Sequence, residues 1–174
     1  MKLYRLFVLL FFTILICYSC IDNSPNTNSK GVDIMEPYLA YTDESIQHYH
    51  DTVYVPVYSD IYTVHRAKSL QLTATLSIRS TSLRDTTYIN EISYYNTHGE
   101  LVRSYIDKTL ILAPMQSIDY VIDRDDTEGG SGANFLITWG GKINTHPLFQ
   151  AVMIGTSGQH GLSFVTDGVS LKNN

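Results

Sequence analysis

The fold is decided by the stretch Leu70-Gln71-Leu72-Thr73-Ala74-Thr75-Leu76-Ser77-Ile78-Arg79. Every second residue is apolar from Leu70 to Ile78, and a polar residue follows each of them. Successive side chains of a strand point to opposite faces, so this alternation predicts one buried face and one solvated face. That pattern is typical of a strand in an antiparallel sheet.

Shorter segments of the same kind flank this strand. Residues 53–57 alternate, although Pro56 cannot donate to a ladder and so predicts an edge or a bulge. Residues 88–96 and 101–106 predict a hairpin, because the turn cluster Asn96–Glu100 separates them. Further strands are expected at 109–113, 117–122, 133–139, 148–154 and 162–165.

These segments amount to about eight short strands with no amphipathic helix among them. They predict an all-β fold, an antiparallel β-sandwich of immunoglobulin-like type, with a barrel as the alternative. The expected core residues are Leu72, Leu76, Ile78, Phe135, Ile137 and Trp139.

The N-terminus has the features of an export signal. Lys2 and Arg5 precede an apolar run of about 13 residues, which suits a signal peptide and is short for a membrane span. Ser19 and Cys20 then resemble a bacterial lipobox, which implies lipidation of Cys20 and a membrane anchor. An ordinary cleaved signal and an uncleaved anchor are the alternatives.

The chain is therefore divided into four parts. Residues 1–19 are the expected lipoprotein signal peptide, and 20–51 the lipidated N-terminus and a flexible tether. Residues 52–168 form the expected sandwich domain, and 169–174 a C-terminal tail. Residues 21–30 are polar and rich in Asn and Ser, a composition that cannot bury apolar surface.

The net charge argues against one class of function, nucleic-acid binding, and the cysteine content constrains how the domain folds. Removing residues 1–19 takes away Lys2 and Arg5 and no acid, so the formal charge changes from −5 to −7. This balance opposes binding to nucleic acid. The processed chain keeps one cysteine, Cys20, so the domain must fold on its hydrophobic core without a disulfide.

The loop from Asp123 to Glu128 is the candidate metal site. Asp123, Asp125 and Asp126 offer the hard oxygen ligands that calcium prefers. An EF-hand starting at Asp123 would need Gly at 128 and Glu at 134, where this chain has Glu and Asn. A solvated turn is the alternative interpretation.

Other motifs are weaker. Gly129-Gly130-Ser131-Gly132 offers backbone amides to an anion, or Ser131 as a nucleophile, but a strand rather than a helix is expected after it. His48, His50 and Asp51 provide too few ligands for a metal site. The 11 tyrosines left after processing suit a recognition surface or simply strands. No catalytic residue or cofactor is expected.

Four segments carry a resemblance to a known family: Tyr54–Tyr58, Tyr94–Asn96, Gly129–Phe135 and Gly158–Phe164. They resemble an uncharacterised family of exported bacterial chains and lipoproteins that share domain of unknown function 3124, over roughly Thr52 to Gly168. The resemblance implies no activity and no functional residue.

The expected protein is a membrane-anchored lipoprotein of the cell envelope, either periplasmic or exposed at the surface. We expect a non-enzymatic binding or assembly module, with an envelope protein or glycan as partner. A small envelope hydrolase and a calcium-binding domain are the alternatives.

Overall fold

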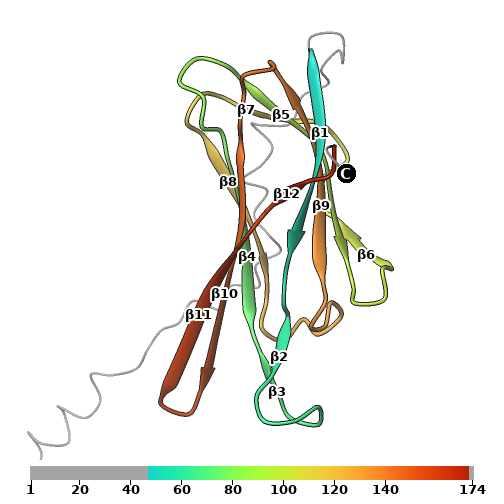
Figure 1. Ribbon diagram of the computed structural model, residues 1–174, viewed down its shortest axis with the longest axis vertical. Coiled ribbons are helices and arrows are strands. Elements are labelled where there is room, and N and C mark those ends of the chain that lie inside the picture. The colour runs from blue at the N-terminus through green and yellow to red at the C-terminus, as the bar shows by residue number, and fades with distance from the viewer. Residues whose placement is uncertain (1–46, 173–174) are drawn as a thin grey trace, which may run out of the picture. The chain divides into compact units, whose positions relative to one another are not determined.

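A computed structural model describes residues 47–172, and this part of the chain consists of strands and loops. Two antiparallel sheets pack face to face (Figure 1). The strand order is β12-β1-β9-β5-β6 in the first sheet, where β7 also pairs with β5, and β11-β10-β4-β8 in the second. The predicted all-β antiparallel sandwich is confirmed, while its immunoglobulin-like type stays a prediction.

The strands of the first sheet are β1 (Tyr49–Pro56), β5 (Thr87–Tyr95), β6 (Leu101–Ser104), β7 (Leu110–Leu112), β9 (Asn134–Gly141) and β12 (Val169–Ser170). Those of the second are β4 (Thr73–Arg79), β8 (Ser117–Ile122), β10 (Leu148–Ser157) and β11 (His160–Asp167). A separate ribbon pairs β2 (Asp60–Tyr62) with β3 (Ser69–Gln71).

The described residues thus contain twelve strands, where about eight were expected. The predicted strand over residues 70–78 is divided between β3 and β4 at Leu72. The partners change there, because β3 pairs with β2 whereas β4 pairs with β10 and β8. Strands β2 and β12 have three and two residues, which is too short to show an alternating pattern.

The core lies between the two sheets, and the six residues expected there are all buried. Strand β4 contributes Leu76 and Ile78, which are fully buried and alternate with polar residues as predicted. The first sheet contributes Phe135, Ile137 and Trp139 from β9, and Trp139 is 4% exposed. Burial of these side chains is the main favourable term in folding.

Strand β5 carries an irregularity that the sequence pattern does not show. Its register with β9 shifts between Ile89 and Glu91. Such a bulge adds one residue to one strand. Ile89 and Ile92, three positions apart, therefore both enter the core.

The sheets extend beyond both expected domain boundaries. Strand β1 begins at Tyr49, three residues before the predicted start at 52. Residues 169–174 were expected to be a tail, but Val169 and Ser170 form β12 and pair with Tyr54 and Val53 of β1. Pro56 is the last residue of β1, and β12 pairs only with Val53 and Tyr54. The missing N–H of Pro56 therefore removes no hydrogen bond between β1 and β12.

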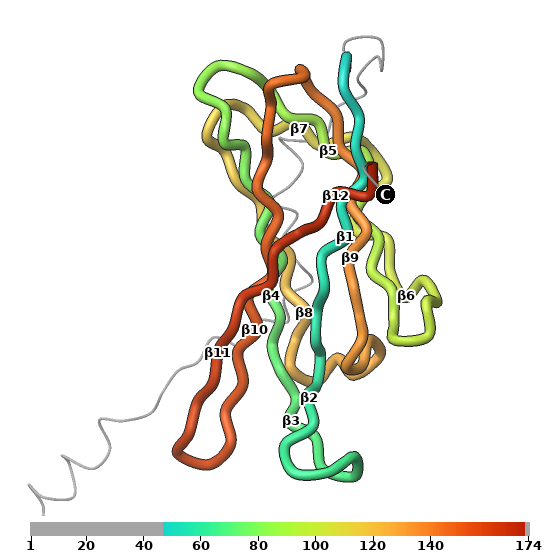
Figure 2. The backbone as a smooth tube through the Cα atoms, viewed as in Figure 1, coloured from blue at the N-terminus to red at the C-terminus, as the bar shows by residue number. Residues whose placement is uncertain are grey.

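Two hairpins lie at the same end of the sandwich, the lower end in Figure 2. One is the β2–β3 ribbon, and the other is the β10–β11 hairpin, whose two-residue turn contains Gly158. β10 pairs with β4 only up to Ile154, and the rest of the hairpin continues past β4. This end carries the candidate site.

Candidate functional site

A pocket of about 450 Å³ lies between the β2–β3 ribbon and the loops that follow β5 and β8. We call it the loop-end pocket. Its size is within the range of pockets for small ligands, about 300–1,000 Å³. It is lined by Asp60, Tyr62, Ser69, Gln71, Thr97, His98, Thr127, Gly130 and Ser131.

The first wall of the pocket is one face of the β2–β3 ribbon. Because side chains alternate along a strand, Ile61 and Leu70 share the opposite face and pack against the core. The pocket face carries two cross-strand pairs, Asp60 with Gln71 and Tyr62 with Ser69. Burial of the apolar face thus determines which side chains face the pocket.

The second wall is the glycine-rich loop, and packing explains two of its glycines. A Cβ atom on Gly129 would lie 1.8 Å from the Tyr94 hydroxyl oxygen. Gly130 has a φ of +75°, and a Cβ there would lie 2.7 Å from the Thr97 hydroxyl oxygen. These glycines therefore allow a close approach of the backbone, which the sequence alone did not distinguish from an anion site.

Hydrogen bonds connect this loop to both neighbouring segments. The backbone N–H and the hydroxyl of Ser59 both donate to the Gly130 carbonyl, each at 3.1 Å. The Thr97 hydroxyl donates to the Gly129 carbonyl at 3.0 Å and accepts the Gly132 N–H at 2.9 Å. The pocket walls are therefore held together by bonds within the protein.

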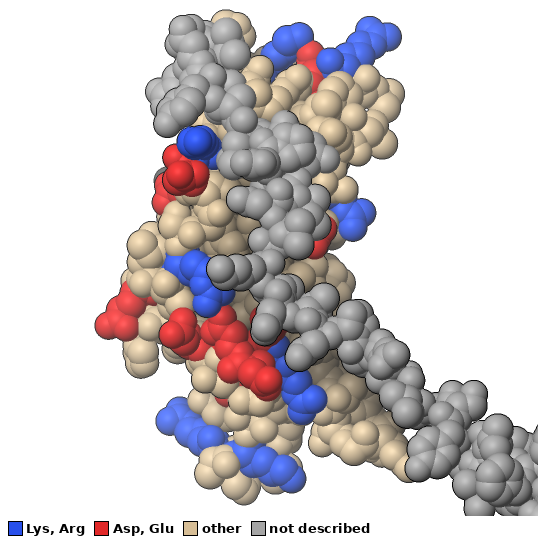
Figure 3. Space-filling view, turned by 180° about the vertical axis from the view of Figure 1, so that it is seen from behind, with Lys and Arg blue, Asp and Glu red and all other residues tan. Residues whose placement is uncertain are grey.

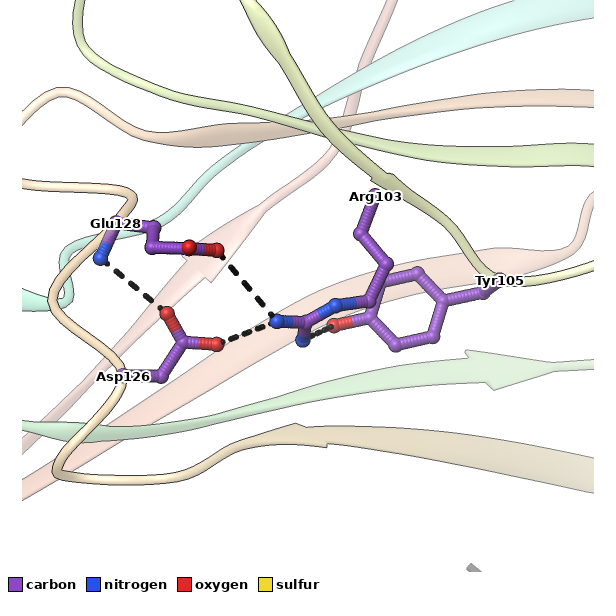
Figure 4. A network of polar contacts seen from close by, with 4 residues as sticks. All are labelled: Arg103, Tyr105, Asp126 and Glu128. Carbon is purple, nitrogen blue, oxygen red and sulfur yellow. Dashed lines mark hydrogen bonds and ion pairs between the residues drawn. The ribbon is translucent and has the colours of Figure 1, made fainter.

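The acidic part of the loop is held to β6 by Arg103 (Figure 4). One guanidinium nitrogen lies 2.9 Å from an Asp126 oxygen and 3.8 Å from a Glu128 oxygen, and the other donates to the Tyr105 hydroxyl at 3.1 Å. The hydrogen bond to Asp126 raises the pKa of Arg103, which stays charged. The cluster positions the loop that forms the pocket wall.

Burial raises the pKa values of two tyrosines, Tyr105 of this cluster and Tyr94. Burial raises the pKa of Tyr94 to about 12, and the negative charge of Asp126 acts in the same direction. Burial also raises the pKa of Tyr105, whose ring packs on Phe135 with centroids 5.7 Å apart. Both phenols stay neutral at physiological pH, and both rings pack on Phe135, while the Tyr105 hydroxyl also accepts the hydrogen bond from Arg103.

Charged side chains are unevenly distributed at this end. On the face shown in Figure 3, acidic side chains gather in the lower half, and basic side chains lie below them. The exposed acids of the pocket loop are Asp123, Asp125 and Glu128. The turn between β2 and β3 carries exposed Arg66 and Lys68.

The predicted calcium ligands are not gathered around one point. Asp123 and Asp125 are exposed, whereas Asp126 is engaged with Arg103. Within residues 47–172, no group of three or more His, Cys, Asp or Glu side chains is arranged to hold a metal ion. The calcium site stays a prediction, and binding there would compete with the Arg103 contact.

The structure brings Ser131 into the same pocket as His98 and Asp60. Catalysis by a serine nucleophile requires a base within hydrogen-bond reach, about 2.6–3.2 Å. Among the described residues, no hydrogen bond joins these three side chains. The sequence placed Ser131 at a loop but did not reveal the other two.

His48 and His50 are both exposed, near a second pocket on the first sheet. This pocket, also about 450 Å³, is lined by His50, Asp51, Thr52, Thr138, Leu171 and Lys172. Lys172 donates to the His50 carbonyl at 2.9 Å and lies 3.8 Å from the centre of the Tyr49 ring. Its lining offers fewer polar side chains than the loop-end pocket does.

The predicted lipidation site, Cys20, and the signal peptide lie outside the described residues. In the described part of the chain, no helix has the length and apolar character needed to cross a membrane.

Asp60, Tyr62, Ser69 and Gln71 are the pocket residues of the β2–β3 ribbon, and sequence reasoning missed all four. The triplets around them are too short for the alternation to be recognised as a strand. The chain reversal at residues 63–68 has no signal in the sequence, because this segment contains no Gly, Pro, Asn, Asp or Ser. Only the pairing of β2 with β3 places these side chains together.

Fold and site together define an antiparallel β-sandwich domain with a polar pocket between its loops. The chain belongs to the family described as Protein of unknown function (DUF3124), whose model matches residues 50–171. None of the curated proteins matches this sequence significantly. A solved structure, titled as the crystal structure of Thermotoga maritima 1070, is 16% identical with a TM-score of 0.39. The match covers 68% of this chain and 92% of that one.

Proposed function

We propose that this protein is a non-enzymatic binding module of the cell envelope and that the loop-end pocket is its binding site. The observation that carries the proposal is a polar pocket whose walls are held in place before any ligand arrives. Hydrogen bonds at Ser59 and Thr97 connect the walls to the glycine-rich loop. A pre-organised site loses less conformational entropy on binding.

The chemistry of the pocket favours binding over hydrolysis. Asp60, His98 and Ser131 line it, but no hydrogen bond among the described residues connects them as nucleophile, base and orienting group. The core side chains fill the space between the sheets, and the pocket lies among the loops. Loops on a rigid scaffold are the usual place for recognition.

Attachment to a membrane through Cys20 is part of the proposal. It is supported by Lys2, Arg5, the apolar run and the Ser19-Cys20 pair. Replacing Cys20 with serine should abolish metabolic labelling with palmitate and leave an unprocessed precursor. Unchanged labelling of this variant would show that the anchor is elsewhere or absent.

The binding site is tested by photo-crosslinking in intact cells. Benzoylphenylalanine is introduced at Tyr62 or at His98, both exposed at the pocket, and at Val165 of β11 as a control. Val165 is 54% exposed, close to the 56% of Tyr62, but does not line the pocket. We expect the same crosslinked species from both pocket positions and not from the control.

Crosslinking that is equal at all three positions, or absent from both pocket positions, would contradict the pocket as binding site. Mass spectrometry of the captured species shows whether it is an envelope protein or a glycan. A captured species that is cleaved by the wild-type chain and left intact by Ser131→Ala would favour the hydrolase alternative.

A further inference from the structure

We propose that the ligand of the loop-end pocket is a neutral saccharide whose ring stacks on Tyr62. The inference rests on the proposed function, because it names the class of ligand for that site. It follows from three properties of the pocket: one exposed aromatic face, a lining that both donates and accepts hydrogen bonds, and the absence of cationic side chains from that lining.

Tyr62 supplies the aromatic surface. Its side chain is 56% exposed although it belongs to a strand, and it shares the pocket face with Ser69. Its strand neighbour Ile61 packs against the core and so fixes which way Tyr62 points. A sugar ring has an apolar face of C–H groups, which an exposed aromatic side chain can cover while its hydroxyl stays in water.

The remaining lining suits a ligand with many hydroxyl groups. Ser69, Thr97, Thr127 and Ser131 have hydroxyls that both donate and accept, and Gln71 has an amide that does the same. Asp60 accepts hydrogen bonds from sugar hydroxyls, and His98 adds an imidazole. A ligand that only donates or only accepts would leave part of this lining unpaired.

The charge of the pocket lining disfavours an anionic ligand. The described lining contains Asp60 and no Lys or Arg. Asp123, Asp125 and Glu128 follow along the adjoining loop, and only Asp126 and Glu128 have Arg103 as a partner. Arg66 and Lys68 on the β2–β3 turn and Arg124 on the acidic loop are exposed, but none of them lines the pocket. A phosphate or a carboxylate inside the pocket would therefore lie beside Asp60 with no Lys or Arg in the lining to receive it. Neutral sugars meet no such barrier.

The test uses the full chain in mild detergent and a panel of neutral oligosaccharides of glucose, galactose, mannose and N-acetylglucosamine. Saturation-transfer NMR identifies binders, and calorimetry measures the Kd of the strongest. We expect Tyr62→Ala to weaken binding by about tenfold or more, as the loss of a buried aromatic contact does. Tyr62→Phe keeps the ring face and should bind within about twofold of wild type.

Two further variants sharpen the comparison. Gln71→Leu removes hydrogen-bonding groups from the same wall and should also weaken binding. Tyr54→Ala changes a half-buried tyrosine of β1 that does not line the pocket, and it should leave the Kd unchanged. Circular dichroism establishes that each variant is folded before it is titrated.

Loss of binding in Tyr62→Phe equal to that in Tyr62→Ala would overturn stacking as the basis of recognition. Failure of every saccharide to bind would overturn the ligand class. If the crosslinking probes at Tyr62 and His98 then capture an envelope protein, the pocket remains a binding site and only the saccharide is wrong. If those probes capture nothing, the proposed function fails as well.

Discussion

Replacing Gly129 with alanine should destabilise the domain strongly, because the added methyl group has no space. It would lie 1.8 Å from the Tyr94 hydroxyl oxygen and 2.9 Å from the Ala133 Cβ. Atoms in contact normally stand about 3.5–4.0 Å apart. Tyr94 is fully buried and packs on Phe135 with ring centroids 5.1 Å apart, so the ring cannot move aside freely.

Extra methyl groups in a packed core cost about 1–3 kcal/mol. We expect about 3 kcal/mol for Gly129→Ala, at the upper end, because the contact with Tyr94 is so short. Tyr94→Phe removes the oxygen that makes this contact, and should therefore recover part of the loss. The double variant should show a coupling of about 1 kcal/mol in a double-mutant cycle.

Urea unfolding, followed by the fluorescence of the single tryptophan, Trp139, measures these differences. Gly161→Ala is the matched control, since the nearest non-adjacent atom to a Cβ there, the Gly155 carbonyl oxygen, is 3.9 Å away. That variant should stay within about 0.5 kcal/mol of wild type. A Gly129→Ala variant as stable as this control, or a cycle without coupling, would refute the packing explanation.

Three further predictions concern charge, pH and the core. Arg103→Met should lower the free energy of unfolding by about 1 kcal/mol at low salt, and by less in 1 M NaCl, since the pair with Asp126 is partly exposed; equal losses in urea titrations at both salt concentrations would contradict this. The pKa of Tyr94 is raised from 10.0 to about 12 in the folded state, so the associated stability is complete below pH 10 and is lost as the pH rises through 12. Tyr94→Phe should flatten this part of the stability–pH curve, and an unchanged slope would exclude Tyr94 as its source. Leu76→Ala should cost about 2–5 kcal/mol because Leu76 is fully buried, whereas Val121→Ala at a 46% exposed position should cost less than about 0.5 kcal/mol in the same assay.

The sequence by itself determined the class of fold and six residues at the centre of the core. The alternation in residues 72–78 is local, and it requires one buried and one solvated face whichever strand lies alongside. The hairpin of β5 and β6 was also visible, because the Asn96–Glu100 turn separates two apolar segments. The same alternation of apolar and polar residues explains why Leu76, Ile137 and the other expected core residues are buried.

The tertiary structure alone decided where alternation is broken. The bulge in β5 brings Ile89 and Ile92 to the same side of the sheet, although residues three positions apart in a regular strand point to opposite faces. The two residues of β12 become a strand only because β1 offers them partners. Such features depend on a neighbouring strand and leave no periodic pattern in the sequence.

The candidate site is likewise a product of tertiary structure. Asp60, His98 and Ser131 are far apart in the chain and meet where the β2–β3 ribbon and two loops come together. Gly129 illustrates the same point, because its motif suggested an anion site while the structure shows contact with Tyr94. A sequence pattern reports the side-chain types that a segment offers, but their function depends on which non-local groups they face after folding.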